Sequence, residues 1–178
     1  MEDALAQFRG AKMADCVAAL EARLGRPLPS DFVPRLRART ADTFRDRLRP
    51  VEEALDLVRA TTGTICVASS GPPEKIMLSL SLTGMLRYFE GRIFSSYAIN
   101  SWKPDPGLFL HVARSLGAEP QACRVVDDSL PGIHAGVTAG MTVFAYQPDG
   151  DDPNIPPGVV TVRRLADLQP ILAAVRAN

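Results

Sequence analysis

Polar groups that could handle a phosphoryl group stand at three places in the sequence, each after a short apolar run typical of a β-strand. The groups are Ser69, Ser70 and Gly71 after TICVA, Lys103 after RIFSS, and Asp127 and Asp128 after CRVV. In an open parallel sheet, ligands gather beyond the carboxyl ends of the strands. We therefore expect these groups, although far apart in the sequence, to meet at one edge of a sheet.

Each group has a chemical use at such an edge. The Ser69 hydroxyl can donate to an oxyanion, and the amides of Ser70 and Gly71 precede an expected helix, where backbone amides attract anions. Lys103 supplies a positive charge, and the prolines of KPDP fix the angle at which it leaves the chain. Adjacent carboxylates are hard oxygen ligands suited to Mg²⁺. Together these groups would cradle a phosphoryl group, whose transfer depends mainly on positioning and charge neutralisation.

Each signal by itself has a simpler explanation. A serine after a strand commonly caps the next helix, and a lysine before a proline is commonly a surface charge. The Asp127–Asp128 pair could cap the helix that SLPG begins. Gly132 and Gly136, four residues apart on one helix face, predict close packing of that helix on the sheet. The three signals in this order on a strand–helix pattern favour the phosphoryl site.

The elements that must position these groups change in type along the chain. Residues 1–47 predict helices alone, one over residues 13–25 that ends at Gly25 and one over residues 29–48 with Ser30 as its N-cap. In residues 48–178, strands and helices alternate, which predicts an α/β domain with a parallel sheet covered on both faces. We expect strands at 64–69, 92–96, 123–128 and 141–146, helices at 51–60, 72–86, 105–117 and 131–140, and a short strand and final helix within 158–175.

Composition argues against several classes of partner. Basic and acidic residues both number 20, so the net charge is zero and gives no general attraction to nucleic acid or membranes. The arginine-rich residues 35–49 are best explained as a solvated helix face. No apolar run approaches the span of a bilayer, and MEDALAQFRG lacks a signal-peptide pattern. We expect a cytoplasmic monomer or weak dimer in which Cys66 and Cys123 are small core residues.

Three segments resemble, in order, the second, third and fourth motifs of the haloacid dehalogenase (HAD) superfamily: CVASSGPPEKI, SWKPDPGLFLHVARSLG and CRVVDDSLPGIHAGVTAGMTVFAY. Within it they are most similar to the β-phosphoglucomutase-like phosphatases, and to bacterial 6-phosphogluconate phosphatases in particular. FRGAKMADCVAALEARLG also resembles part of that group's helical cap. The resemblance implies a Rossmann-like three-layer core, a partial cap, and a Mg²⁺-dependent phosphatase acting on small phosphate esters such as sugar phosphates or 6-phosphogluconate.

The resemblance also implies a role for each polar group. Ser69 would hydrogen-bond the transferring phosphoryl group, and Lys103 would steady that group and the nucleophile. Asp128 would bind Mg²⁺ directly, and Asp127 directly or through water. The expected substrate contacts are Ser70 and Gly71, together with Arg9, Gly10 and Lys12, where the cap would close over an acidic sugar.

The family's first motif, a strand ending in Asp-x-Asp-Gly-Thr, is not found in this sequence. In the family its first aspartate attacks phosphorus and its second is the acid–base group. PDGDDP has a similar composition but follows the wrong strand. We therefore expect a core that lacks its central strand, between residues 64–69 and 123–128, and impaired turnover. The sequence would then be a fragment or start inside a longer reading frame, which the upstream DNA would reveal.

Three other functions remain open at this point. A sugar phosphomutase uses the same core, and would yield isomerised sugar phosphate instead of free phosphate. A phosphate- or partner-binding remnant would bind without turnover. A phospho-signalling receiver domain also combines a carboxylate pair, a hydroxyl and a Lys-Pro. In a receiver, however, the carboxylate pair comes first, whereas here it follows Ser69 and Lys103.

Overall fold

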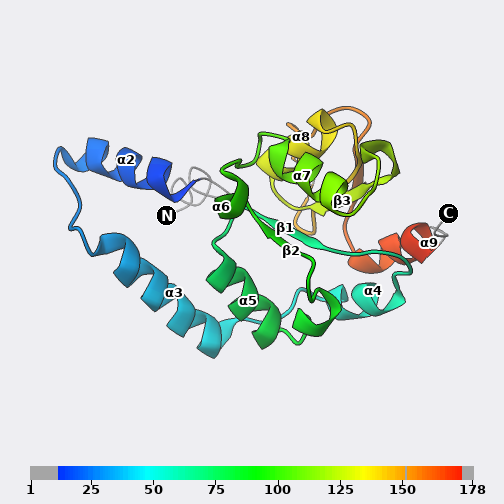
Figure 1. The fold of residues 1–178 in the computed structure, drawn as a ribbon, viewed down its shortest axis with the longest axis horizontal. Coiled ribbons are helices and arrows are strands. Elements are labelled where there is room, and N and C mark those ends of the chain that lie inside the picture. Colours follow the sequence, from blue (N-terminus) through cyan, green and yellow to red (C-terminus); the bar gives the residue numbers. More distant parts are fainter. Residues whose placement is uncertain (1–11, 151, 174–178) are drawn as a thin grey trace.

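The computed structural model describes residues 12–150 and 152–173, in which helices and strands alternate after an all-helical start (Figure 1). The elements are α2 (Met13–Leu24), α3 (Phe32–Arg47), α4 (Ala54–Ala60), β1 (Val67–Ser69), α5 (Pro73–Leu82), η1 (Leu86–Tyr88), β2 (Ile93–Ser95), α6 (Ser96–Ile99), α7 (Gly107–Ser115), η2 (Pro120–Ala122), β3 (Arg124–Asp127), α8 (Leu130–Thr138), β4 (Thr142–Tyr146), β5 (Val160–Val162), η3 (Leu165–Leu168) and α9 (Gln169–Ala173). The predicted order of helices and strands is confirmed.

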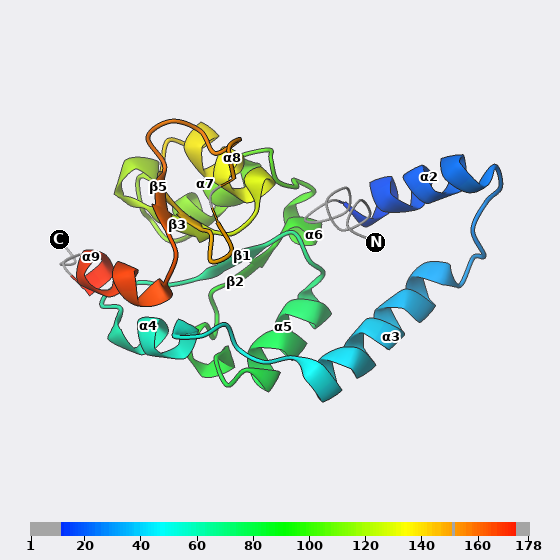
Figure 2. The same cartoon turned by 180° about the vertical axis from the view of Figure 1, so that it is seen from behind.

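Helices α2 and α3 extend away from the strands (Figures 1 and 2). α2 ends at Gly25, which has φ 64° as a helix-terminating glycine should. The predicted Ser30 cap is wrong, because the Phe32 amide first bonds the Pro29 carbonyl in a turn (2.9 Å), so that the helix begins at Phe32 with Asp31 before it. No helix within the described ranges is long and apolar enough to cross a membrane.

Every described strand pair is parallel, as predicted. β1 pairs with β2 in the register Val67↔Ile93, and β3, β4 and β5 form a second sheet in that order. The second predicted strand ends earlier than expected, since the Ser95 hydroxyl accepts a hydrogen bond from the Tyr97 amide and starts the short helix α6. The sequence analysis did not anticipate this helix.

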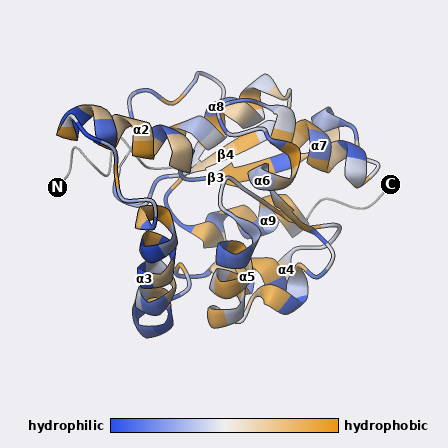
Figure 3. Cartoon of the chain, turned by 60° about the vertical axis from the view of Figure 1, so that its left-hand side comes forward, coloured by the Kyte–Doolittle hydropathy of each residue, from blue (hydrophilic) through white to orange (hydrophobic). Residues whose placement is uncertain are grey.

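Helices cover both faces of the strands and create three layers. On one face, α7 and α8 bury a cluster that includes Ile133 (0% exposed) against β3 and β4. On the other face, α4 and η3 pack on β4 and β5, and α5 packs beside β1 and β2. Residues of β4 alternate between these faces, with Val143 in the first cluster and Phe144 in the second. Figure 3 shows β3 and β4 as hydrophobic ribbons between the helices.

Strands β1 and β3 lie in different sheets. Among the described residues, β1 pairs with β2 alone and β3 with β4 alone. Helix α7 joins the two sheets, because it contacts β1, β2 and α8. These are the strands between which the sequence predicts a missing central strand, and that absence stays a prediction.

The predicted burial of two cysteines is wrong. Cys66 precedes β1 and Cys123 precedes β3, and both are free thiols that are only half-buried. Partial burial still raises the pKa of each thiol above its ordinary value, with Cys123 adding to the effect at Cys66. The apolar runs begin one or two residues before the strands do, so the cysteines fall at the ends of the core.

Candidate active site

The polar groups at the strand ends line one cavity of about 400 Å³ between the two sheets. Ser69, Ser70 and Gly71 reach it from the end of β1, and Asp127 and Asp128 reach it from the end of β3. Lys103 reaches it from the loop between α6 and α7. The remaining lining residues are Val67, Ala68, Lys75, Ile76, Ser79, Leu80, Ser129 and Pro131. The structure therefore brings together three signals that the sequence separates.

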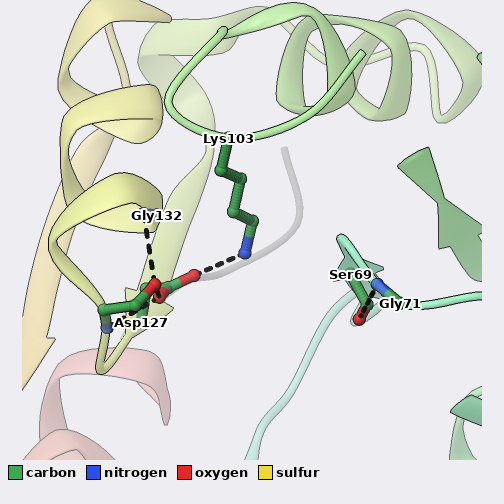
Figure 4. Close-up of polar contacts among 6 residues, drawn as sticks. Ser69, Gly71, Lys103, Asp127 and Gly132 are labelled. Carbon is green, nitrogen blue, oxygen red and sulfur yellow. Dashed lines mark hydrogen bonds and ion pairs between the residues drawn. The ribbon is translucent and has the colours of Figure 1, made fainter. Parts of the chain in front are cut away.

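Asp127 is the most constrained side chain in this cavity. One of its oxygens accepts from the Lys103 ammonium at 2.6 Å, and the other accepts from the backbone amide and the hydroxyl of Ser129, at 3.0 and 2.7 Å (Figure 4). The side chains of Lys103 and Asp127 are 11% and 10% exposed. A buried ion pair with three charge-assisted bonds has a single favoured geometry.

Gly132 leaves room for this carboxylate. A Cβ built on Gly132 would lie 2.1 Å from the Asp127 side-chain carbon, whereas one on Gly136 would meet the Val143 side chain at 2.8 Å. Gly136 thus allows the predicted close packing of helix on sheet, but Gly132 serves the carboxylate. The Ser129 hydroxyl, which caps α8 through the Gly132 amide at 3.2 Å, completes the arrangement. The sequence analysis missed Ser129, although its place as the cap of this helix was a usable signal.

The loop that carries Lys103 is stabilised by its own polar groups. Asp105 accepts from the Ser101 hydroxyl at 2.6 Å and from the Gly107 amide at 2.7 Å. These two bonds lower the pKa of Asp105 below its ordinary value. The Lys103 ammonium also lies 5.0 Å from the centre of the Phe109 ring, a cation–π contact between the loop and α7. The direction of the lysine is therefore set by the loop and by the helix that follows it.

The opposite wall of the cavity, at the end of β1, has fewer hydrogen bonds. The Gly71 amide donates to the Ser69 hydroxyl at 3.1 Å (Figure 4), and the buried Ser95 hydroxyl donates to the Gly71 carbonyl at 2.7 Å. The Gly71 amide, expected to face an anion, is thus directed at Ser69 in this structure. The Ser70 hydroxyl is buried and has no hydrogen-bond partner among the described residues. An orphaned buried hydroxyl marks a place for a ligand or water.

Two carboxylates fit a magnesium ion here. Asp127 and Asp128 are adjacent at the end of β3 and both line the cavity. Mg²⁺ is commonly held by one or two protein carboxylates with water and substrate phosphate completing its shell. Within residues 12–150 and 152–173 no group of three or more His, Cys, Asp or Glu side chains gathers as a metal site. The donor set therefore matches a metal that shares its shell with a phosphate ester.

Of the three predicted cap residues, the described part of the chain includes Lys12 alone. Arg9 and Gly10 lie outside the described residues. Lys12 precedes α2, and its ammonium lies 4.3 Å from the centre of the Trp102 ring. Trp102 directly precedes Lys103 in the sequence. Trp102 in turn packs edge-on against Tyr97 at 5.5 Å. Lys12 is thus placed against the loop that carries Lys103 and is not among the residues that line the cavity.

The sequence and the fold have counterparts among known proteins. The family model of the haloacid dehalogenase-like hydrolases matches residues 5–140. The chain belongs to the haloacid dehalogenase-like hydrolase family. The HAD resemblance predicted from three motifs is confirmed. The chain is also 34% identical over 169 residues to the 6-phosphogluconate phosphatase of Escherichia coli K12, covering 94% of this chain and 76% of the relative.

Solved structures show the same HAD fold. A haloacid dehalogenase-like protein from Agrobacterium tumefaciens C58 matches with a TM-score of 0.77 and 22% identity, over 97% of this chain and 82% of its own. A HAD family hydrolase from Deinococcus radiodurans R1, solved with bound phosphate and sodium, matches with a TM-score of 0.69 and 23% identity, over 93% and 77%. The predicted α/β class with a parallel sheet is therefore confirmed.

Proposed function

We propose that this chain descends from a Mg²⁺-dependent phosphatase of small phosphorylated metabolites and that its cavity binds the phosphoryl group of a sugar phosphate. The observation that carries the proposal is the Lys103–Asp127 pair, held at 2.6 Å beside Asp128 and opposite Ser69 in one cavity. A cation, a hydroxyl and two carboxylates that could hold a metal ion, arranged around one space, match the needs of phosphoryl binding.

Each side chain has a defined task in this proposal. Lys103 neutralises charge on the phosphoryl oxygens, and Ser69 donates its hydroxyl proton to one of them. Asp127 and Asp128 would hold Mg²⁺, which supplies further neutralisation of the phosphoryl oxygens when bound. Ser129 keeps the Asp127 carboxylate oriented through two hydrogen bonds. Helices in residues 1–47 would form the cap, and residues 48–178 the core that carries the site.

The names of two relatives support a substrate class for this proposal. The E. coli relative is named for 6-phosphogluconate, and a relative from Thermotoga maritima, 31% identical over 91 residues, is named a phosphorylated carbohydrates phosphatase. We therefore infer a sugar phosphate or a phosphorylated sugar acid as the ligand. A phosphomutase activity would require the product to be an isomerised ester, which product analysis distinguishes from free phosphate.

Turnover by the 178-residue chain is a separate matter from binding. The sequence contains no Asp-x-Asp-Gly-Thr segment, and residues 149 and 152 of PDGDDP are not among the residues that line the cavity. We infer that this polypeptide binds phosphate but hydrolyses esters slowly, because loss of a covalent nucleophile costs on the order of a millionfold in other enzymes.

Calorimetric titration with inorganic phosphate in the presence and absence of Mg²⁺ tests the binding site. We expect Mg²⁺-dependent binding that Lys103→Met weakens by roughly tenfold or more, because a charge-assisted hydrogen bond is lost. Arg114→Met, which removes an exposed charge from α7 away from the cavity, is the control. Phosphate binding that is equal in Lys103→Met and in the control would contradict the proposed site.

Hydrolysis of an aryl phosphate tests the statement about turnover. We expect little Mg²⁺-dependent release of phosphate by the 178-residue chain. Robust release that Asp128→Ala abolishes would show that these residues support the full reaction, and the inference of slow turnover would then be wrong.

A further inference from the structure

A second polar cluster joins the phosphoryl cavity to a larger groove beneath the cap helices. The groove has a volume of about 780 Å³ and is lined by apolar residues of α2, α3 and α5. Ser70, Gly71 and Lys75 line both spaces. Figures 1 and 2 both show α3 beside α5, and the two helices contact each other. A ligand whose phosphoryl group lies at Lys103 must therefore pass these three residues to reach the groove.

Lys75 is the charged member of this junction. It lies in the first turns of α5, and its side chain is exposed. Its ammonium is 5.6 Å from the centre of the Phe44 ring of α3, which places it between core and cap. No carboxylate within the described residues pairs with it. An exposed ammonium above an aromatic ring can accept an anionic partner without first losing an ion pair.

The described residues that line the groove next to Lys75 include more basic than acidic side chains. Arg37, Arg45 and Lys75 line it, and Glu74 is its single acidic lining residue. Arg45 is partly neutralised, since it pairs with Asp42 at 2.7 Å. With Asp42 and Glu74 counted against the three basic side chains, the groove keeps an excess of one positive charge. Such an environment favours a ligand with a second negative charge.

Ser70 supplies an independent observation at the same junction. Its hydroxyl is buried and has no hydrogen-bond partner in the described structure. Leaving a buried hydroxyl unpaired costs about 1–3 kcal/mol, so a ligand hydroxyl that pairs with it would gain affinity. A polyhydroxylated chain extending from the phosphoryl group meets this requirement. Each of the two cavities, at about 400 and 780 Å³, falls within the usual size range of small-molecule sites.

We propose that Lys75 is a specificity-determining residue that binds a carboxylate at the end of the substrate remote from the phosphoryl group, so that the site prefers phosphorylated sugar acids over neutral sugar phosphates. This inference rests on the proposed function, because it needs the phosphoryl group to lie at Lys103. Ser70 pairs with a hydroxyl of the intervening carbon chain. Lys75 recognises the negative charge of the substrate carboxylate, and it takes no part in bond breaking.

Calorimetry with two matched esters tests the proposal. 6-Phosphogluconate and glucitol 6-phosphate differ only at the far end, where one carries a carboxylate and the other a hydroxymethyl group. With Mg²⁺ present, we expect the 178-residue chain to prefer 6-phosphogluconate by roughly two- to fivefold, the size of one ion-pair contact at an exposed site. Lys75→Gln should reduce this preference to near one, and Lys75→Arg should retain most of it. Arg114→Gln, which removes a distant charge, is the control and should keep the full preference.

The three lysines of the chain provide a second measurement. Lys12, Lys75 and Lys103 are its only lysines, so reductive ¹³C-methylation gives one NMR signal for each side chain. Glucitol 6-phosphate should shift the Lys103 signal and leave Lys75 nearly unchanged. 6-Phosphogluconate should shift both. Assignment follows from the spectra of the Lys→Arg variants.

The outcomes separate this inference from the proposed function. If inorganic phosphate and both esters fail to bind, the proposed function and the role of Lys75 are both wrong. If phosphate binds but 6-phosphogluconate is not preferred, or if Lys75→Gln leaves the preference intact, only the role of Lys75 is wrong. If Lys75→Gln weakens phosphate and both esters equally, Lys75 belongs to the phosphoryl site, and the carboxylate assignment is overturned.

Discussion

The cavity that we propose for the phosphoryl group has two walls, and they differ in burial and in the number of hydrogen bonds that hold their polar groups. The wall at β3 stands on a three-stranded sheet whose central strand is buried on both faces, and its carboxylate, Asp127, accepts three hydrogen bonds. The wall at β1 stands on a two-stranded sheet in which Ser95 is the one strand residue classed as buried. The hydroxyl of this wall, that of Ser69, accepts a single hydrogen bond, from the Gly71 amide. Packing therefore fixes the charged wall much more firmly than the hydroxyl wall.

This difference has a direct bearing on function. A preorganised carboxylate and ammonium contribute to ligand binding without paying for reorganisation. The β1 wall has one neighbouring strand and fewer buried side chains, so its local opening should cost less free energy. We expect ligand affinity to depend on how well the β1 wall is held in place.

The largest expected effect comes from deleting the same side chain on each side. Ile133 of α8 is fully buried against the three-stranded sheet, whereas Ile93 of β2 is half-buried. Ile133→Ala should lower the free energy of unfolding by about 4 kcal/mol and Ile93→Ala by about 2 kcal/mol, because more buried surface and a larger cavity are involved in the first. Urea unfolding followed by circular dichroism measures both. Equal costs would mean that the two sheets are equally well packed.

The contrast also explains what the sequence could and could not predict. Two strands of the three-stranded sheet could be predicted from the sequence, because CRVVDD and MTVFAY are apolar runs with clear turn residues around them. Strands β3 and β4 lie within these runs. The end of the second predicted strand was harder. RIFSS does not show that a serine hydroxyl starts a helix within it, since capping depends on where the next amide lies.

Within the site, residue types were predictable and pair geometry was not. The sequence placed Lys103 and Asp127 at the same edge, but only coordinates show that they form a direct 2.6 Å pair. The same holds for Gly132, whose contact with the carboxylate depends on the path of α8 past the end of β3. The sequence analysis did not select Lys75 as a candidate, because it lies inside a helix, away from the strand ends that the pattern emphasises.

A second, smaller effect is expected when a glycine of each wall is replaced by alanine, which adds one methyl group. In Gly132→Ala the new carbon would collide with the Asp127 carboxylate at 2.1 Å, whereas in Gly71→Ala it would meet the Ser69 hydroxyl at 3.4 Å, an ordinary contact. We expect Gly132→Ala to cost about 2 kcal/mol of stability and to weaken Mg²⁺-dependent phosphate binding, because the carboxylate must move. Gly71→Ala should change stability by less than about 1 kcal/mol. Urea unfolding and phosphate titration check both.

The two glycine variants also bear on how rigid the charged wall is. If Gly132→Ala binds phosphate as tightly as the unaltered chain, the Asp127 carboxylate can relocate at little cost, and the wall is less constrained than its hydrogen bonds suggest. If Gly71→Ala is the more damaging change, the order of the two walls is reversed.

The smallest effect concerns a tie on the outer face of the three-stranded side. Glu53, just before α4, accepts hydrogen bonds from the Arg164 guanidinium and from the Ala166 amide, the latter at 2.9 Å. The Arg164 bond and then the amide bond lower the pKa of Glu53 below its ordinary value of 4.5. Because the folded-state pKa is depressed, the tie stabilises the fold at neutral pH and loses that effect as the pH falls through the folded-state value.

Glu53→Gln should therefore be slightly less stable than the unaltered chain at pH 7, and the difference should shrink as the pH falls below about 4.5, where the native carboxylate also becomes protonated. Urea midpoints at several pH values measure this. Glu90→Gln, an exposed change that affects none of these contacts, should show no such narrowing. A Glu53→Gln deficit that stays constant down to pH 3 would mean that the lost stability comes from packing of the side chain and not from its charge.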